Sequence, residues 1–133
     1  MRFRSINIYS GECTDGNRRK KLTKMLRNDS DLVVDAYLKS FKYYINENCI
    51  SLNISCDENT EECFLEEIAK GYPELHIPFD LDHYVQIPEC KKSEYWLSVI
   101  QDSIKYVSNI WNWDYTFFDG VFTRCRKFLD NKM

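Results

Sequence analysis

The segment ISLNIS at residues 50–55 places isoleucine, leucine and isoleucine at alternate positions, with serine or asparagine between them. Successive side chains of a β-strand point to opposite faces, so this pattern predicts a strand with one buried and one polar face. Strands of that kind are typical of an antiparallel or mixed sheet that helices cover on one side. The segment therefore favours a small sheet in an α+β fold.

Three other runs also alternate and are predicted as strands. In residues 3–9, Phe3 shares a face with Tyr9, opposite Ile6 and Ile8. Residues 75–79 and 83–87 are extended runs joined by a turn at 80–82, and their prolines favour an edge position in the sheet.

Helical spacing of apolar residues predicts the remaining elements. A short basic helix is expected over residues 17–27, and a second helix over 31–39, with N-cap chemistry at 29–31. The apolar pattern of residues 31–45 also fits a strand. We therefore divide this region and predict a helix over 31–39 and a strand over 41–45, which would form a hairpin with the strand at 50–55. A third helix is predicted over 61–69, ending at Gly71, and its buried stripe would be Phe64, Leu65, Ile68 and Ala69.

The strongest helical pattern runs from Ser93 to Trp111, and a last helix extends from about residue 117 to the end of the chain. The aromatic residues at 111–115, between these two helices, are expected to pack into the interior.

The bulk composition is typical of a single globular domain spanning residues 1–133, because 133 residues with 44% hydrophobic content can form one core. The first residues lack the apolar stretch of an export signal, and no apolar run approaches the roughly 20 residues that cross a bilayer. We therefore expect a cytoplasmic protein without membrane contact. In that compartment, the six cysteines are expected to stay reduced.

Charge is distributed unevenly along the chain, although the formal net charge is only −3. Up to residue 27, eight basic residues face two acidic ones, whereas residues 57–94 contain eleven acidic and three basic residues. Such an acidic segment creates a field that attracts a basic partner, provided that the fold gathers the carboxylates on one side.

Catalytic and metal-binding motifs are weak. Asp80, Asp82 and His83 are the candidates for an enzyme site assembled from dispersed residues, but no phosphate-binding loop accompanies them. Cys90 with His76 or His83 would be the candidate thiolate and base, although alternation places His76 on the surface. The cysteines lack the close pairing of zinc ligands, so no metal or other cofactor is expected.

The basic segment at residues 18–27 is the candidate for a nucleic-acid-binding or regulatory module. Arg18, Arg19, Lys20 and Lys21, with Lys24 and Arg27, could contact phosphates. The acidic remainder of the chain argues against this interpretation, because it would repel a polyanion.

In general character the chain resembles the cytosolic immunity proteins of bacterial toxin systems, including those of contact-dependent inhibition. It is small and acidic, contains several cysteines and has no catalytic motif. The resemblance implies a binding protein, an antitoxin that covers the basic active site of a nuclease-type toxin. We therefore expect a protein partner rather than a small molecule or nucleic acid. The residues expected to meet it are eight carboxylates: Asp57, Glu58, Glu61, Glu62, Glu66, Glu67, Asp80 and Asp82.

Overall fold

The computed structural model describes residues 2–41 and 49–132 and confirms an α+β fold. Its elements are, in order, β1 (Arg2–Ser10), α1 (Gly16–Lys39), β2 (Cys49–Asp57), β3 (Phe64–Ala69), β4 (Tyr72–Pro78), α2 (Leu81–Val85), a short 3₁₀ turn (Glu89–Lys91), α3 (Lys92–Trp111) and α4 (Tyr115–Lys132). Within the described residues, the strands form one mixed sheet in the order β1-β2-β4-β3.

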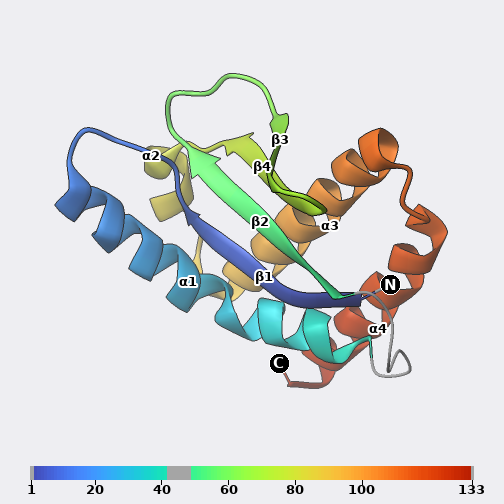
Figure 1. Cartoon of the computed structure of the whole chain (residues 1–133). Coiled ribbons are helices and arrows are strands. Elements are labelled where there is room, and N and C mark those ends of the chain that lie inside the picture. Colours follow the sequence, from blue (N-terminus) through green and yellow to red (C-terminus); the bar gives the residue numbers. More distant parts are fainter. Residues whose placement is uncertain (1, 42–48, 133) are drawn as a thin grey trace.

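Three strands of the sheet run in the same direction. β1 pairs in parallel with β2, β2 pairs in parallel with β4, and only β3 is antiparallel to its neighbour. The carboxyl ends of β1, β2 and β4 therefore meet at one end of the sheet, at the upper left of the ribbon (Figure 1).

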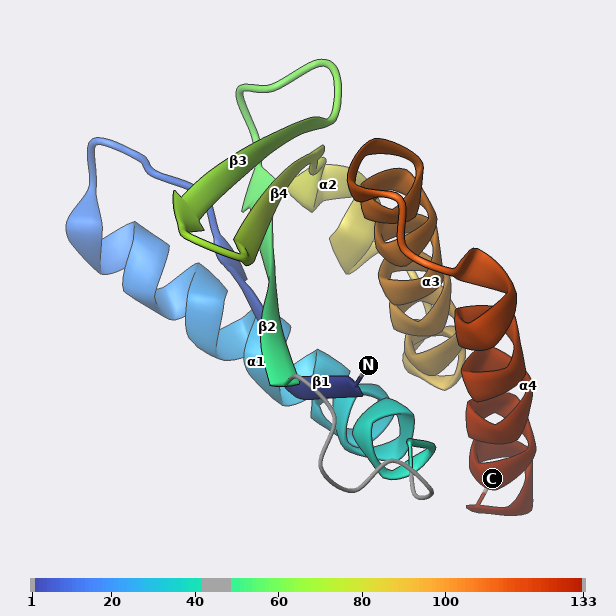
Figure 2. The ribbon, with the colours of Figure 1, turned by 45° about the vertical axis from the view of Figure 1, so that its right-hand side comes forward.

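The sheet has one apolar and one polar face, as the alternation in residues 50–55 predicted. Leu52 and Ile54 are fully buried and belong to a single core cluster with residues of α1, α3 and α4. These helices pack against one another and against the sheet (Figure 2). Asn53 and Ser55 lie on the opposite face, so the side chains of that face are available for polar contacts.

A bulge in β1 changes the predicted assignment of Phe3. The register with β2 shifts between Phe3 and Ser5, which adds a residue to β1 and places Phe3 on the same face as Ile6 and Ile8. Phe3 is buried and stacks on Phe118, with 5.3 Å between the ring centroids. The prediction that Phe3 shares the face of Tyr9 was wrong because strict alternation does not anticipate a bulge.

Helix α1 is continuous, whereas the sequence predicted two helices separated near residues 28–30. Asp15 caps its start by accepting hydrogen bonds from the backbone N–H groups of Asn17 and Arg18. Asp29 was expected near the cap of a second helix, but its carboxylate accepts a hydrogen bond from the Tyr84 hydroxyl at 2.6 Å. Tertiary contacts thus overcome the weak helix propensity of residues 28–30.

The predicted helix at 61–69 was wrong, since residues 64–69 form strand β3. Phe64 and Ile68, two of the four residues of the expected buried stripe, are 40% and 53% exposed. Gly71 does not end a helix but lies between β3 and β4 with φ of 82°, a conformation that glycine adopts at little cost. Pairing with β4 therefore decides the local structure of this acidic segment.

The predicted strand at 83–87 was also wrong, because Leu81–Val85 forms the short helix α2. Asp80 caps α2, with its carboxylate accepting a hydrogen bond from the backbone N–H of His83 at 3.3 Å. Tyr84 then points into the core and is 1% exposed. The predicted strand at 41–45 falls almost wholly outside the described residues, together with its hairpin.

The predicted C-terminal helices are confirmed. Trp96, Ile100, Ile104 and Val107 of α3 are fully buried, and Trp111, Trp113 and Tyr115 pack, partly buried, against the core. The described thiols, at positions 13, 56, 63, 90 and 125, are free. No helix among the described residues is long and apolar enough to cross a bilayer.

We predict that Tyr84→Phe lowers the free energy of unfolding by about 1–3 kcal/mol. The Tyr84 hydroxyl accepts a hydrogen bond from the Trp96 indole at 3.0 Å and donates one to Asp29, so its removal leaves both groups without this partner. Urea denaturation measures the loss. Tyr72→Phe, at a ring 37% exposed, is the matched control and should change stability by less than about 0.5 kcal/mol. Equal effects of the two substitutions would contradict the prediction.

Candidate functional site

The polar face of the sheet carries a network of side chains that crosses several strands. Asn7 of β1 donates from Nδ2 to Oδ1 of Asn53 in β2 at 3.0 Å, and Asn53 in turn donates to the carbonyl oxygen of Pro73 in β4 at 3.1 Å. These bonds satisfy amides that are largely enclosed. They hold three strands in register below the end of the sheet where the titratable side chains gather.

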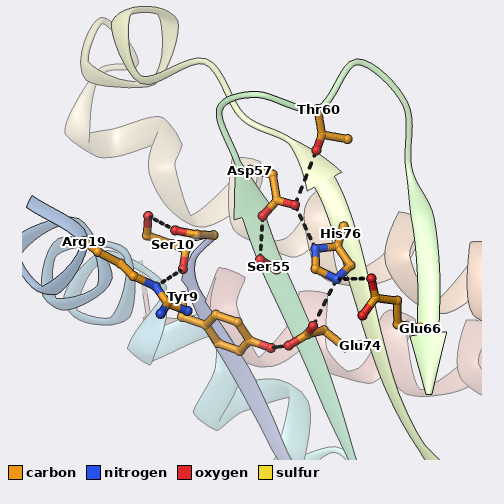
Figure 3. Close-up of polar contacts among 10 residues, drawn as sticks. Tyr9, Ser10, Arg19, Ser55, Asp57, Thr60, Glu66, Glu74 and His76 are labelled. Atoms are coloured by element: carbon orange, nitrogen blue, oxygen red, sulfur yellow. Dashed lines mark hydrogen bonds and ion pairs between the residues drawn. The ribbon is translucent and has the colours of Figure 1, made fainter. Parts of the chain in front are cut away.

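His76 lies at the centre of these titratable groups (Figure 3). Its Nδ1 is 2.7 Å from Oδ2 of Asp57, and its Nε2 is 3.0 Å from Oε1 of Glu74 and 3.7 Å from Oε1 of Glu66. Phe64 stacks on the imidazole with 4.2 Å between the centroids and a 6° angle between the planes. The Asp57 carboxylate at one edge of the imidazole and the Phe64 ring stacked on its face thus fix the orientation of His76.

The sequence placed His76 on the surface, but its side chain is only 14% exposed. Nε2 is shielded from solvent and makes no hydrogen bond to any described residue, although Oε1 of Glu74 lies 3.0 Å away. A buried nitrogen without a hydrogen bond is uncommon in folded proteins. The environment of Nε2 is therefore the unusual feature of this face.

Asp57 is held on three sides at the end of β2. Ser55 donates a hydrogen bond to Oδ1 at 2.5 Å, and Thr60 donates to Oδ2 at 3.4 Å. The chain after β1 passes so close that a Cβ atom at Gly11 would come within 2.0 Å of Asp57 Oδ1. The position of this carboxylate therefore depends on a glycine at position 11.

Tyr9, near the end of β1, is hydrogen-bonded to Oε2 of Glu74. Burial, followed by this hydrogen bond, raises the pKa of the Tyr9 phenol above its usual value. The phenol therefore keeps its proton and donates to Glu74. This hydrogen bond fixes one oxygen of the Glu74 carboxylate, and the second oxygen faces His76.

A pocket of about 410 Å³ contains this cluster. Besides Tyr9 and His76, its lining includes five carboxylates and one cation, Arg19. The five carboxylates are Glu12, Asp57, Glu58, Glu66 and Glu74. Among the described residues, Glu66, Glu74 and His76 are the one group of His, Cys, Asp or Glu side chains whose ligand atoms lie close enough together to hold a metal ion.

A second pocket, of about 650 Å³, adjoins the first and shares Glu58 and Thr60 with it. Asp80, Asp82 and His83, the candidates for a dispersed enzyme site, line this second pocket. One oxygen of Asp80 is engaged in capping α2. Cys90 lines a different, smaller pocket beside α4. A thiolate and its base must lie in one pocket, but His76 and His83 line the other two pockets, so neither is placed to act as the base for Cys90.

The eight carboxylates predicted to meet a partner fall into two sets. Five of them line the two adjoining pockets: Asp57, Glu58, Glu66, Asp80 and Asp82. Glu61 and Glu62 are exposed in the loop between β2 and β3, and Glu67, next to Glu66 in a strand, points to the other face of the sheet.

The basic segment lies along α1, beside the acidic pockets. Arg18 donates two hydrogen bonds to Glu58, one of them at 2.9 Å, and this interaction lowers the pKa of the Glu58 carboxyl. Four further cations of this segment line a groove of about 550 Å³, which shares Tyr9 and Arg19 with the acidic pocket. These cations are Arg19, Lys20, Lys24 and Arg27.

Glu74 and Tyr9 were not predicted as functional residues, and His76 was not predicted to act on this face. A signal was present, because residues 74 and 76 share one face of a strand and are both titratable. Their meeting with Glu66 and Asp57 depends on the pairing of β4 with β3 and β2, which alternation within one strand does not reveal.

Comparisons of the chain with protein-family models, with curated proteins and with solved structures gave no match.

We predict that Gly11→Ala lowers the free energy of unfolding by about 1–3 kcal/mol, because the added methyl group must displace the Asp57 carboxylate. Chemical denaturation measures the change. Gly16→Ala is the matched control, since no described atom outside the adjacent residues and the backbone of α1 lies within 4 Å of its added Cβ, and its effect should stay within about 0.5 kcal/mol. A Gly11→Ala protein as stable as Gly16→Ala would show that Asp57 is not confined in this way.

Proposed function

We propose that this chain is a binding protein that presents the acidic end of its sheet to a basic protein partner. One observation carries the proposal: seven carboxylates and only two arginines line the two adjoining pockets. The carboxylates are Glu12, Asp57, Glu58, Glu66, Glu74, Asp80 and Asp82. Carboxylates from several elements in one concave region create a field that attracts cations more strongly than isolated charges do.

Within residues 2–41 and 49–132, the charges of this region are only partly neutralised by other side chains. Arg18 pairs with Glu58, and Arg19 donates from Nε to the carbonyl oxygen of Ser10 at 3.2 Å. His76 is shared among three carboxylates, so it can balance at most one of them. Negative charge therefore remains for a lysine or arginine side chain of a partner to neutralise.

The most concrete form of the proposal is a cytosolic immunity protein that blocks a basic nuclease-type toxin. A nuclease cleft is lined with cations that hold phosphates, and the carboxylates of the two pockets would replace those phosphates as the counter-charges of the cations. The general resemblance to immunity proteins and the acidic pockets support this form. The inhibition would require no chemistry from the chain, because covering the cleft is sufficient.

We predict that the association rate with a basic nuclease domain falls steeply as salt is added, since ions screen charges beyond about 10 Å at 0.1 M ionic strength. In low salt, Glu61→Lys/Glu62→Lys should reduce this rate by about tenfold or more, because both residues are exposed in the loop beside the pockets. Stopped-flow mixing gives the rate, and residual nuclease activity gives the inhibition.

The matched control is Asp31→Lys/Asp130→Lys, which makes the same charge change at exposed positions of α1 and α4. This control should keep most of the association rate. A salt-independent rate, or an equal loss in the two double variants, would contradict the proposal.

The basic groove along α1 supports a second candidate function, the binding of a nucleic acid through its phosphates. Arg19, Lys20, Lys24 and Arg27 line this groove, and their spacing along one side of a helix suits a polyanion. The neighbouring acidic pocket would confine the contact to α1.

For this second function, we predict retardation of a short RNA or duplex DNA at moderate salt that Lys20→Glu/Lys24→Glu abolishes. The control Lys91→Glu/Lys105→Glu reverses two exposed charges away from the groove and should leave retardation unchanged. A gel-shift titration with both nucleic acids provides the measurement. If the unaltered protein retards neither nucleic acid, this second candidate function is excluded.

A further inference from the structure

We propose that Glu66, Glu74 and His76 form a binding site for a divalent transition-metal ion of the zinc class. The ion would lie on the polar face of the sheet, between β3 and β4. This inference goes beyond the partner proposed for the acidic pockets, and its test does not require that partner.

The separations of the three ligand atoms suit a single ion. Zinc binds imidazole nitrogen and carboxylate oxygen at about 2.0–2.2 Å, which places two ligand atoms about 3.4 Å apart in tetrahedral geometry and about 3.0 Å apart at a right angle. Nε2 of His76 lies 3.0 Å from Oε1 of Glu74 and 3.7 Å from Oε1 of Glu66. Small rotations of the half-exposed Glu66 side chain would complete the geometry.

The state of His76 also suits a ligand. In the neutral imidazole, a proton on Nδ1 that is donated to Asp57 leaves the lone pair on Nε2, and this is the tautomer that binds a metal ion through Nε2. That nitrogen is shielded from solvent, makes no hydrogen bond to a described residue, and faces the two glutamates. A metal ion at this point would satisfy the nitrogen that the protein leaves without a hydrogen bond.

The groups behind the ligands follow the pattern of protein metal sites. Metal-bound histidines commonly donate their second N–H to a carboxylate, and metal-bound carboxylates are themselves hydrogen-bonded. Asp57 takes the first role, with Ser55 donating to it at 2.5 Å, and Tyr9 takes the second by donating to Glu74. Phe64 adds a stacked ring that fixes the plane of the imidazole. Two of the three ligands are thus orientated before any ion arrives.

Electrostatics favours a cation at the same point. Asp57, Glu66 and Glu74 surround His76, and a single imidazole balances at most one of the three carboxylates. Like charges at such separations repel one another, and a divalent ion would remove that repulsion. One imidazole and two carboxylates suit zinc, cobalt or manganese better than calcium, which prefers a shell of six to eight oxygen atoms.

Three protein ligands leave at least one coordination position open, as in sites where a metal activates water or binds a further ligand. Glu66, Glu74 and His76 all line the pocket of about 410 Å³, so this open position would face the pocket.

The test is a calorimetric titration of the metal-free full chain with Zn²⁺. We expect one ion per chain, and a loss of affinity of about tenfold or more in each of Glu66→Gln, Glu74→Gln and His76→Gln. The matched control is Glu67→Gln, which changes a neighbouring exposed glutamate that points to the other face of β3 and should bind as the unaltered chain does.

Cysteine thiols also bind zinc, and Cys63 and Cys90 are exposed, so a second measurement locates the ion. Paramagnetic Co²⁺ should broaden the amide resonances around Glu66, Glu74 and His76 first in NMR spectra of the unaltered chain. This measurement also serves if His76→Gln fails to fold. Absence of binding, equal affinity in Glu66→Gln and Glu67→Gln, or broadening centred on the cysteines would overturn the proposal.

Discussion

The parallel alignment of β1, β2 and β4 is the constraint on which both the core and the acidic pockets depend. It brings the ends of three strands together, so that Tyr9, Asp57 and His76 meet although 67 positions separate the first from the last. Ligands of open sheets with parallel strands commonly bind at this end, where the loops after the strands leave room. Alternation along β2 then separates apolar contacts from polar ones.

The sequence predicted those elements whose local pattern agrees with their tertiary surroundings. Strand β2 and helix α3 were correct because one side of each is buried and the other is not. Residues 64–69 were assigned to a helix because their apolar spacing fits one, and only the hairpin around Gly71 reveals the strand. The abundance of carboxylates was evident from the sequence, but the partners of His76 depend on strand order, which no local pattern contains.

Gathering carboxylates around one imidazole opposes folding, because like charges approach one another in a partly enclosed space. The protein offsets this repulsion with donors placed at fixed points: Ser55 for Asp57, Tyr9 for Glu74, and Arg18 for Glu58. Such arrangements commonly mark functional sites, where stability is sacrificed for a prepared binding surface. The core, formed by three helices on the other face, supplies the stability that this face lacks.

Strand β3 forms an edge of the sheet, and this position has a consequence for how the protein behaves at high concentration. The outer side of an edge strand can pair with a strand of another copy, and the exposed Phe64 and Ile68 would favour such stacking. Glu66 and Glu67 lie between them, so two approaching copies would bring their negative charges into contact. The same glutamates thereby help to prevent aggregation into extended, fibre-like sheets.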